Sequence, residues 1–149
     1  MFAFADKLLE VTEKHADKLS AQWCKAVSAN RRLPWFQSMK PEACAAFALD
    51  FYKNFRNVYF DEKPYKKLEK YFIHYAEENF HSGVPLEEAV YALIMMRRHI
   101  WLFADFQALF ISATDQHRAV ETINRTIRVF DQGIYIIIRR YGELGKEKK

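Results

Sequence analysis

The sequence predicts an all-α fold, a single-domain five-helix bundle in which the two C-terminal helices are long. Three observations support this class. The chain has 149 residues, enough for one domain with a sizeable core. Half of the residues are hydrophobic and 16% are aromatic. Only 4 glycines and 4 prolines are present, which is too few for the many tight turns of a β-sandwich or barrel.

The N-terminal half of the chain predicts three helices, because apolar residues recur there at three- and four-residue steps. The first predicted helix covers residues 5–29 and ends before Pro34, since proline disfavours a helical conformation in the residue that precedes it. The second begins near Pro41, a residue suited to a first helical turn. A break at residues 61–64 separates the second helix from the third, which ends near residue 80.

The clearest boundary is the sequence HSGVPLEE at residues 81–88. Gly83 suits a left-handed helix C-cap, and Pro85 then precedes the fourth predicted helix, residues 86–110. The fifth predicted helix covers residues 116–141 and follows the N-capping sequence SATD. Its last part, GIYIIIRRY, has the composition of a strand but keeps the helical period, which favours helix.

No repeat, linker or second domain interrupts this pattern. We therefore predict one helical sensor or regulatory domain over residues 1–141. The remaining sequence, GELGKEKK at residues 142–149, is predicted to be a frayed basic tail.

The charge pattern bears on partners and location. The net charge is +4, but Lys and Arg are spread along the chain rather than gathered on one face, so the pattern does not favour nucleic-acid binding. No uncharged run is long enough for membrane insertion, and the N-terminus carries charge too early for a secretory signal. Two cysteines without a CxxC spacing indicate reduced thiols in a cytoplasmic protein.

The fifth predicted helix carries a heptad repeat of apolar residues, with spacings that alternate between three and four. Its members are Val120, Ile123, Ile127, Phe130, Ile134, Ile137 and Tyr141. Such a repeat is typical of a core helix of a bundle and also of an interface, either with a second copy or with a downstream helix, and both can hold together. On the fourth helix, His99 and Phe106 belong to a second apolar face that a partner could cover.

Catalytic and metal-binding motifs are absent from the sequence: it has no GxSxG, no glycine-rich phosphate loop and no HExxH, so we expect no enzyme activity. His74, Glu78 and His81 share one helix face and are candidate metal ligands, although a solvated face near a helix end explains them as well. We expect no cofactor. Haem is the alternative, with one of the five histidines as its ligand.

Arg97 falls near the centre of an apolar face of the fourth helix. Because an unpaired buried charge is very costly, the sequence predicts a partner, with Asp131 as first choice and Asp50 as second. The pair would act as a charge lock or as the anchor of an anionic small molecule. The third possibility is that the fourth helix has a different phase and Arg97 is a surface residue. Arg98 falls on a polar strip of the same helix and is predicted to be an ordinary surface residue.

The stretch HSGVPLEEAVYALIMMRRHIWLF at residues 81–103 resembles the N-terminal sensory domain of the RsbRD-type co-antagonists of the bacterial stressosome. The segment LSAQWCKAV…RLP at residues 19–34 and the long final helix extend the resemblance to nearly the whole chain. The resemblance implies a globin-related bundle, dimeric and without haem in the best-known relatives. Such domains pass a signal through the last helix to an output domain.

This chain stops at Lys149 with no output domain, so a stand-alone relative or a cut fragment is implied, and Met1 favours the former. The resemblance carries no catalytic residues, and only Arg97 matches an arginine position of the family pattern. We expect a non-enzymatic regulatory domain for signal transduction that forms a homodimer and acts on a separate signalling protein. A haem- or small-ligand-binding globin-like sensor is the alternative.

Overall fold

A computed structural model of the chain describes residues 3–106 and 113–147, and the side chains of residues 6–102 and 120–147. The described residues form seven helices and no strand, which confirms the all-α class. The helices are α1 (Ala3–Lys14), α2 (Ala16–Ser28), α3 (Pro34–Gln37), α4 (Pro41–Tyr59), α5 (Lys66–His81), α6 (Leu86–Phe106) and α7 (Ala113–Glu147). Within these ranges, no helix combines the length and the apolar character needed to span a bilayer.

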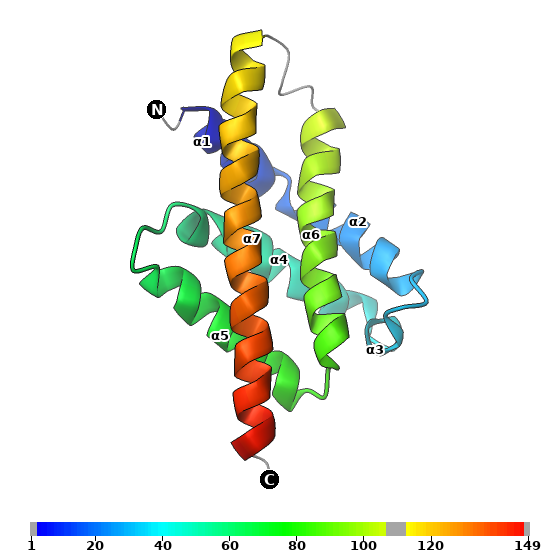
Figure 1. Ribbon diagram of the computed structural model, residues 1–149. Helices are drawn as coiled ribbons and strands as arrows, with labels where there is room; N and C mark the ends of the chain where they lie inside the picture. The colour runs from blue at the N-terminus through cyan, green and yellow to red at the C-terminus, as the bar shows by residue number, and fades with distance from the viewer. Residues whose placement is uncertain (1–2, 107–112, 148–149) are drawn as a thin grey trace.

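The helices are arranged in two layers (Figure 1). Helices α6 and α7 run antiparallel and side by side, and α7 extends well beyond the rest of the molecule. Helices α1, α2, α4 and α5 cross behind this pair. Buried side chains of all seven helices, Phe36 of the one-turn α3 included, form one continuous cluster that is the core. Leu144, near the C-terminal end of α7, is buried outside this cluster.

The first predicted helix is divided in two. His15, with φ −110° and ψ 23°, leaves the helical conformation and separates α1 from α2. One turn earlier, the Thr12 hydroxyl donates a hydrogen bond to the Leu8 carbonyl at 2.8 Å, a bond that bends helices. The bend lets α1 pack on α7 and α4 while α2 packs on α4 and α6. The one-turn helix α3, which starts at Pro34, was not predicted because four residues are too few to show a period.

The boundary between α5 and α6 is confirmed. Gly83 has φ +86°, in the left-handed region. The Val84 N–H donates to the Asn79 carbonyl at 2.9 Å, and the Gly83 N–H to the Phe80 carbonyl at 3.1 Å, so both groups satisfy the end of α5. The Tyr141 hydroxyl then donates to the Val84 carbonyl at 2.9 Å, which ties α7 to this corner.

Three aromatic side chains from three helices hold α6 by its backbone. Each donates a hydrogen bond to a carbonyl of α6: Trp23 to Ala92 at 3.0 Å, Tyr52 to Met96 at 3.0 Å and Tyr75 to Ala89 at 2.9 Å. Burial raises the pKa of Tyr52 and of Tyr75, so both phenols stay protonated and remain donors. The high aromatic content of the chain thus supplies polar contacts as well as apolar packing.

The prediction of a frayed tail from Gly142 is wrong as far as Glu147, because α7 continues to that residue. Leu144 is buried, and Arg140 lies within 3.2–3.9 Å of three carboxylates, those of Glu77 in α5 and of Glu143 and Glu147 in the last turns of α7. These contacts stabilise the end of α7 by more than Gly142 and Gly145 destabilise it as helix residues. The segment GIYIIIRRY is helical, as predicted.

Candidate functional site

Helix α7 carries an exposed apolar surface, which we call the α7 strip: Val120, Ile127, Tyr135 and Ile138, with exposed fractions of 55%, 39%, 60% and 48%. Since an α-helix turns by about 100° per residue, the four side chains fall within an arc of about 80°. Leu102 on α6 is the other large hydrophobic side chain that is exposed among the described residues. A row of this kind differs from the scattered apolar residues of an ordinary surface, which makes the α7 strip a candidate interaction site.

The predicted heptad interface on α7 is divided between surface and core. Val120 and Ile127 are exposed, and Ile123 and Ile134 are half-buried. The last part of the repeat was wrongly assigned to an interface, since Phe130, Ile137 and Tyr141 are buried in the core. The cause is geometric: a seven-residue repeat drifts by about 20° per heptad around a straight helix, so the stripe turns from the surface into the core.

In the C-terminal half of α7, the exposed apolar side chains are Tyr135 and Ile138, which lie outside the heptad repeat. Ile138 follows Ile127 by 11 residues, close to three full turns, and follows Val120 by 18 residues, which is five full turns. Neither residue belongs to the seven-residue repeat, so the heptad pattern does not predict their exposure. A search for spacings of 11 and 18 would have found Ile138.

The predicted ion pair between Arg97 and Asp131 is absent. Arg97 is half-buried, and its Cζ lies 5.7 Å from the centroid of the Phe130 ring, a cation–π contact. Asp131 is exposed, and neither residue forms an ion pair with a described residue. Asp50, the second choice, accepts a hydrogen bond from the Tyr71 hydroxyl at 3.3 Å.

The reason for this error is the phase of α6. The buried face of the helix is centred on small and aliphatic residues, Ala89, Leu93, Met96 and Ile100. Arg97 lies at the edge of this face, beside α7, where an aromatic ring covers it and water still reaches it. A carboxylate partner is therefore not required.

His99 lines a groove between α2 and α6, the α2–α6 groove, of about 590 Å³. Its lining residues are Lys18, Gln22, Lys25, Ala26, Ala29, His99 and Leu102. His99 Nδ1 lies 2.8 Å from the Met95 carbonyl, so Nδ1 carries the hydrogen and donates. Arg98 is exposed on the polar strip predicted for it. The side chain of Phe106, assigned to the same face as His99, lies outside the described residues.

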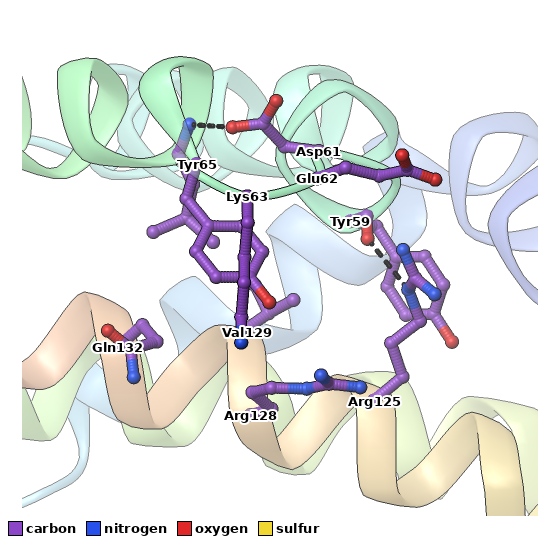
Figure 2. A pocket seen from close by; sticks show the side chains of 10 residues that line it. Tyr59, Asp61, Glu62, Lys63, Tyr65, Arg125, Arg128, Val129 and Gln132 are labelled. Atoms are coloured by element: carbon purple, nitrogen blue, oxygen red, sulfur yellow. Dashed lines mark hydrogen bonds between the residues drawn. The ribbon is translucent and has the colours of Figure 1, made fainter.

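A second hollow, of about 200 Å³, lies between α7 and the residues that connect α4 to α5. Figure 2 shows Arg125 of α7 reaching the carbonyl of Tyr59, to which its Nε donates at 3.0 Å, while Lys63 extends toward α7. Asp61 accepts a hydrogen bond from the Leu68 N–H at 2.9 Å and so caps α5. Arg125 and Asp61 therefore hold the corner together. Sequence analysis missed both roles, since neither residue stands in a motif.

The candidate metal ligands lie on the surface of α5. His74 Nε2 is 3.0 Å from a carboxylate oxygen of Glu78, and these two residues and His81 are exposed. Among the described side chains, no three His, Cys, Asp or Glu residues are placed to hold a metal ion. None of the four described histidines, His15, His74, His81 and His99, is buried, and His117 lies outside the described side chains.

The two cysteines of the chain, 20 residues apart in sequence, meet where α2 packs on α4. The Cys24 thiol lies 3.9 Å from the carbonyl of Pro41, in the first turn of α4. Cys44 stands one turn further along α4 and is buried. Burial is the main cause that raises the pKa of the Cys44 thiol to about 12, and the neighbouring Cys24, as acceptor for the Cys44 S–H and as a nearby charge when ionised, raises it further. A thiol in this state is a poor nucleophile at neutral pH.

We predict that iodoacetamide at pH 8 modifies Cys24 in the native protein and leaves Cys44 unmodified, which mass spectrometry of the intact chain and its peptides checks. Cys44 should react once guanidinium unfolds the chain. Because the pKa of Cys44 is raised from 9.0 to about 12, its contribution to stability is complete below pH 9 and is lost as the pH rises toward 12. Equal modification of both thiols in the native state would contradict the burial of Cys44.

No family model, no curated protein and no solved structure matches the chain. The globin relationship and the resemblance to RsbRD-type domains therefore stay predictions, while the all-α fold stands on the structure itself.

Proposed function

We propose that this protein is a non-enzymatic regulatory domain that forms a homodimer through the α7 strip. The observation that supports the proposal is the row of four exposed apolar side chains on α7. Val120 and Ile138 stand five turns apart on one line, so the row is about 27 Å long. Most oligomers of a single chain are symmetric, and a twofold axis lets the same surface cover itself.

Two charged residues, Asp131 inside the arc of the strip and Arg128 at its edge, favour an antiparallel arrangement of the two α7 helices. Arg128 and Asp131 are exposed near the middle of the row, and neither forms an ion pair with a described residue. A twofold axis that crosses the strip at the level of Val129 would bring Val120 level with Ile138 of the partner subunit, and Arg128 within one residue of the level of Asp131 of the partner subunit. A parallel arrangement would set like charges against each other, which is unfavourable.

Such a dimer would act on a separate signalling protein that binds one of its faces. The resemblance to the sensory domains of bacterial stressosome co-antagonists supports this role in signal transduction. Two free cysteines are compatible with the reducing environment of the bacterial cytoplasm, where we place the protein.

Light scattering coupled to size-exclusion chromatography tests the dimer. The native protein should show twice the chain mass of 17.7 kDa at high micromolar concentration. Ile138→Asp should weaken association by at least about tenfold, because it places a charge in an apolar interface. Leu102→Asp is the matched control: Leu102 is equally exposed but lies on α6, and its replacement should leave the mass unchanged.

Charge reversal tests the antiparallel arrangement separately. Arg128→Asp and Asp131→Arg should each weaken the dimer, and the double variant should restore it, since the opposite charges then meet again. A monomeric native protein would overturn the proposed function. A dimer that tolerates both single variants would overturn only the antiparallel arrangement.

A second candidate function is a small-ligand or haem sensor, and the α2–α6 groove is the observation that favours it, because about 590 Å³ lies within the range of small-molecule sites. A visible absorption band after incubation with haem would support the haem form of this candidate. A spectrum equal to that of free haem would contradict it.

A further inference from the structure

Cys24 and Cys44 are the only two cysteines of the chain, and the fold brings them together from different helices. Helices α2 and α4 form one of the most extensive helix pairs of the molecule. Cys24 approaches the Pro41 carbonyl, and in an α-helix the side chain three residues later lies beside that carbonyl. The residue three positions after Pro41 is Cys44. The two thiols therefore lie on the facing sides of α2 and α4, beside the same backbone carbonyl, and Cys24 is the neighbour that acts on the Cys44 thiol.

The surroundings of the two thiols differ in a way that assigns them different roles. Cys24 is half-buried, so a small solute reaches it, whereas Cys44 is 1% exposed. Burial keeps Cys44 protonated, which protects it from direct oxidation. In a pair of this kind, the accessible sulfur reacts with the oxidant, and the buried sulfur then reacts with the oxidised one.

We propose that Cys24 and Cys44 form an oxidation site for hydroperoxides, at which an intramolecular disulfide joins α2 to α4. The Cys24 thiolate attacks one oxygen of the peroxide, the O–O bond breaks, and water leaves after protonation, so that Cys24 becomes a sulfenic acid. The Cys44 thiol, which burial keeps protonated, passes its proton to the sulfenic hydroxyl as its sulfur attacks the Cys24 sulfur. The S–O bond breaks and a second water leaves with the Cys44 proton.

The balance is two thiols and one hydrogen peroxide to one disulfide and two waters. We expect the sulfenic acid to be short-lived, because the packing of α2 on α4 places Cys44 beside Cys24. This inference is independent of the proposed dimer, since both cysteines lie on helices other than α7.

Mass spectrometry of the native protein after treatment with hydrogen peroxide tests the proposal. We expect the loss of two hydrogen atoms per chain, a tryptic peptide pair that joins Cys24 to Cys44, and full reversal by dithiothreitol. The oxidised chain should keep its native oligomeric mass. Because the bond closes a loop of about 20 residues, the Tm should rise by about 5–10 °C.

Two serine variants complete the experiment. Cys44→Ser should accumulate the sulfenic acid at Cys24, which dimedone traps, while Cys24→Ser should resist peroxide because Cys44 is buried. The wild-type chain should trap little dimedone. Addition of oxygen to Cys24 without a disulfide in the wild-type chain would overturn the proposal, as would a disulfide that joins two chains instead of two helices.

Discussion

Replacing Trp23 with alanine should lower the free energy of unfolding by about 3–5 kcal/mol, the range for a fully buried aromatic side chain. Trp23 is 0% exposed. Its ring stacks on Phe47, with 5.5 Å between centroids, and meets Phe36 edge-on at 5.8 Å. Because these rings also belong to the core, the cavity cannot collapse without disturbing them. Urea denaturation followed by circular dichroism measures the effect.

Two variants separate the causes of this loss. Trp23→Phe keeps an aromatic ring but removes the hydrogen bond to the Ala92 carbonyl, so we expect a smaller loss than for alanine. Trp35→Ala removes a half-buried ring at the edge of the same cluster and should cost less than half as much as Trp23→Ala. A loss below about 1 kcal/mol for Trp23→Ala would show that the core does not depend on this residue.

Gly133→Ala should also destabilise the protein, by about 1–3 kcal/mol, although alanine is ordinarily the better helix residue. A Cβ at position 133 would lie 2.6 Å from Cζ of Phe72, which is far inside the contact distance. Phe72 is fully buried and meets the Tyr71 ring edge-on at 5.4 Å, so its ring has no free space to enter. The glycine lets α7 approach α5 closely.

The same helix offers a matched control. Gly142 is also in α7, and a Cβ at that position would meet nothing within 4 Å. Gly142→Ala should therefore stabilise the protein by about 0.5–1 kcal/mol through helix propensity alone. Opposite signs for the two glycines in thermal denaturation would support this account, and equal signs would contradict it.

Local signals in the sequence were sufficient for most helix boundaries. Pro41 starts a helix and Gly83 ends one because their backbone preferences act within a few residues. The bend at His15 has no such signal, since the apolar period continues through it and only the packing of two helix halves on different neighbours requires the break. The helical end of α7 depends on carboxylates of α5 and α7 that a one-dimensional pattern does not bring together.

The candidate site was predicted less well, for a related reason. The sequence identifies α7 as a helix with apolar residues beyond the needs of one face, but the division into core and surface depends on the angle at which α7 meets α5. A difference of about 20° per heptad was enough to move Phe130 and Ile137 from the predicted interface into the core. The prediction of a buried ion pair at Arg97 is wrong for the same reason. A small error in the rotational phase of α6 decides whether this charge is buried or lies at the edge of the core over the Phe130 ring.

The three hydrogen bonds that Trp23, Tyr52 and Tyr75 donate to α6 have a mechanical consequence. They fix the axial register of the helix, because sliding α6 by a single residue, about 1.5 Å, would break all three at once. The acceptors are backbone carbonyls, so no side chain of α6 can adjust to preserve them. α6 is thus held at one axial position against α2, α4 and α5, and this position does not depend on which side chains α6 carries at its outer face.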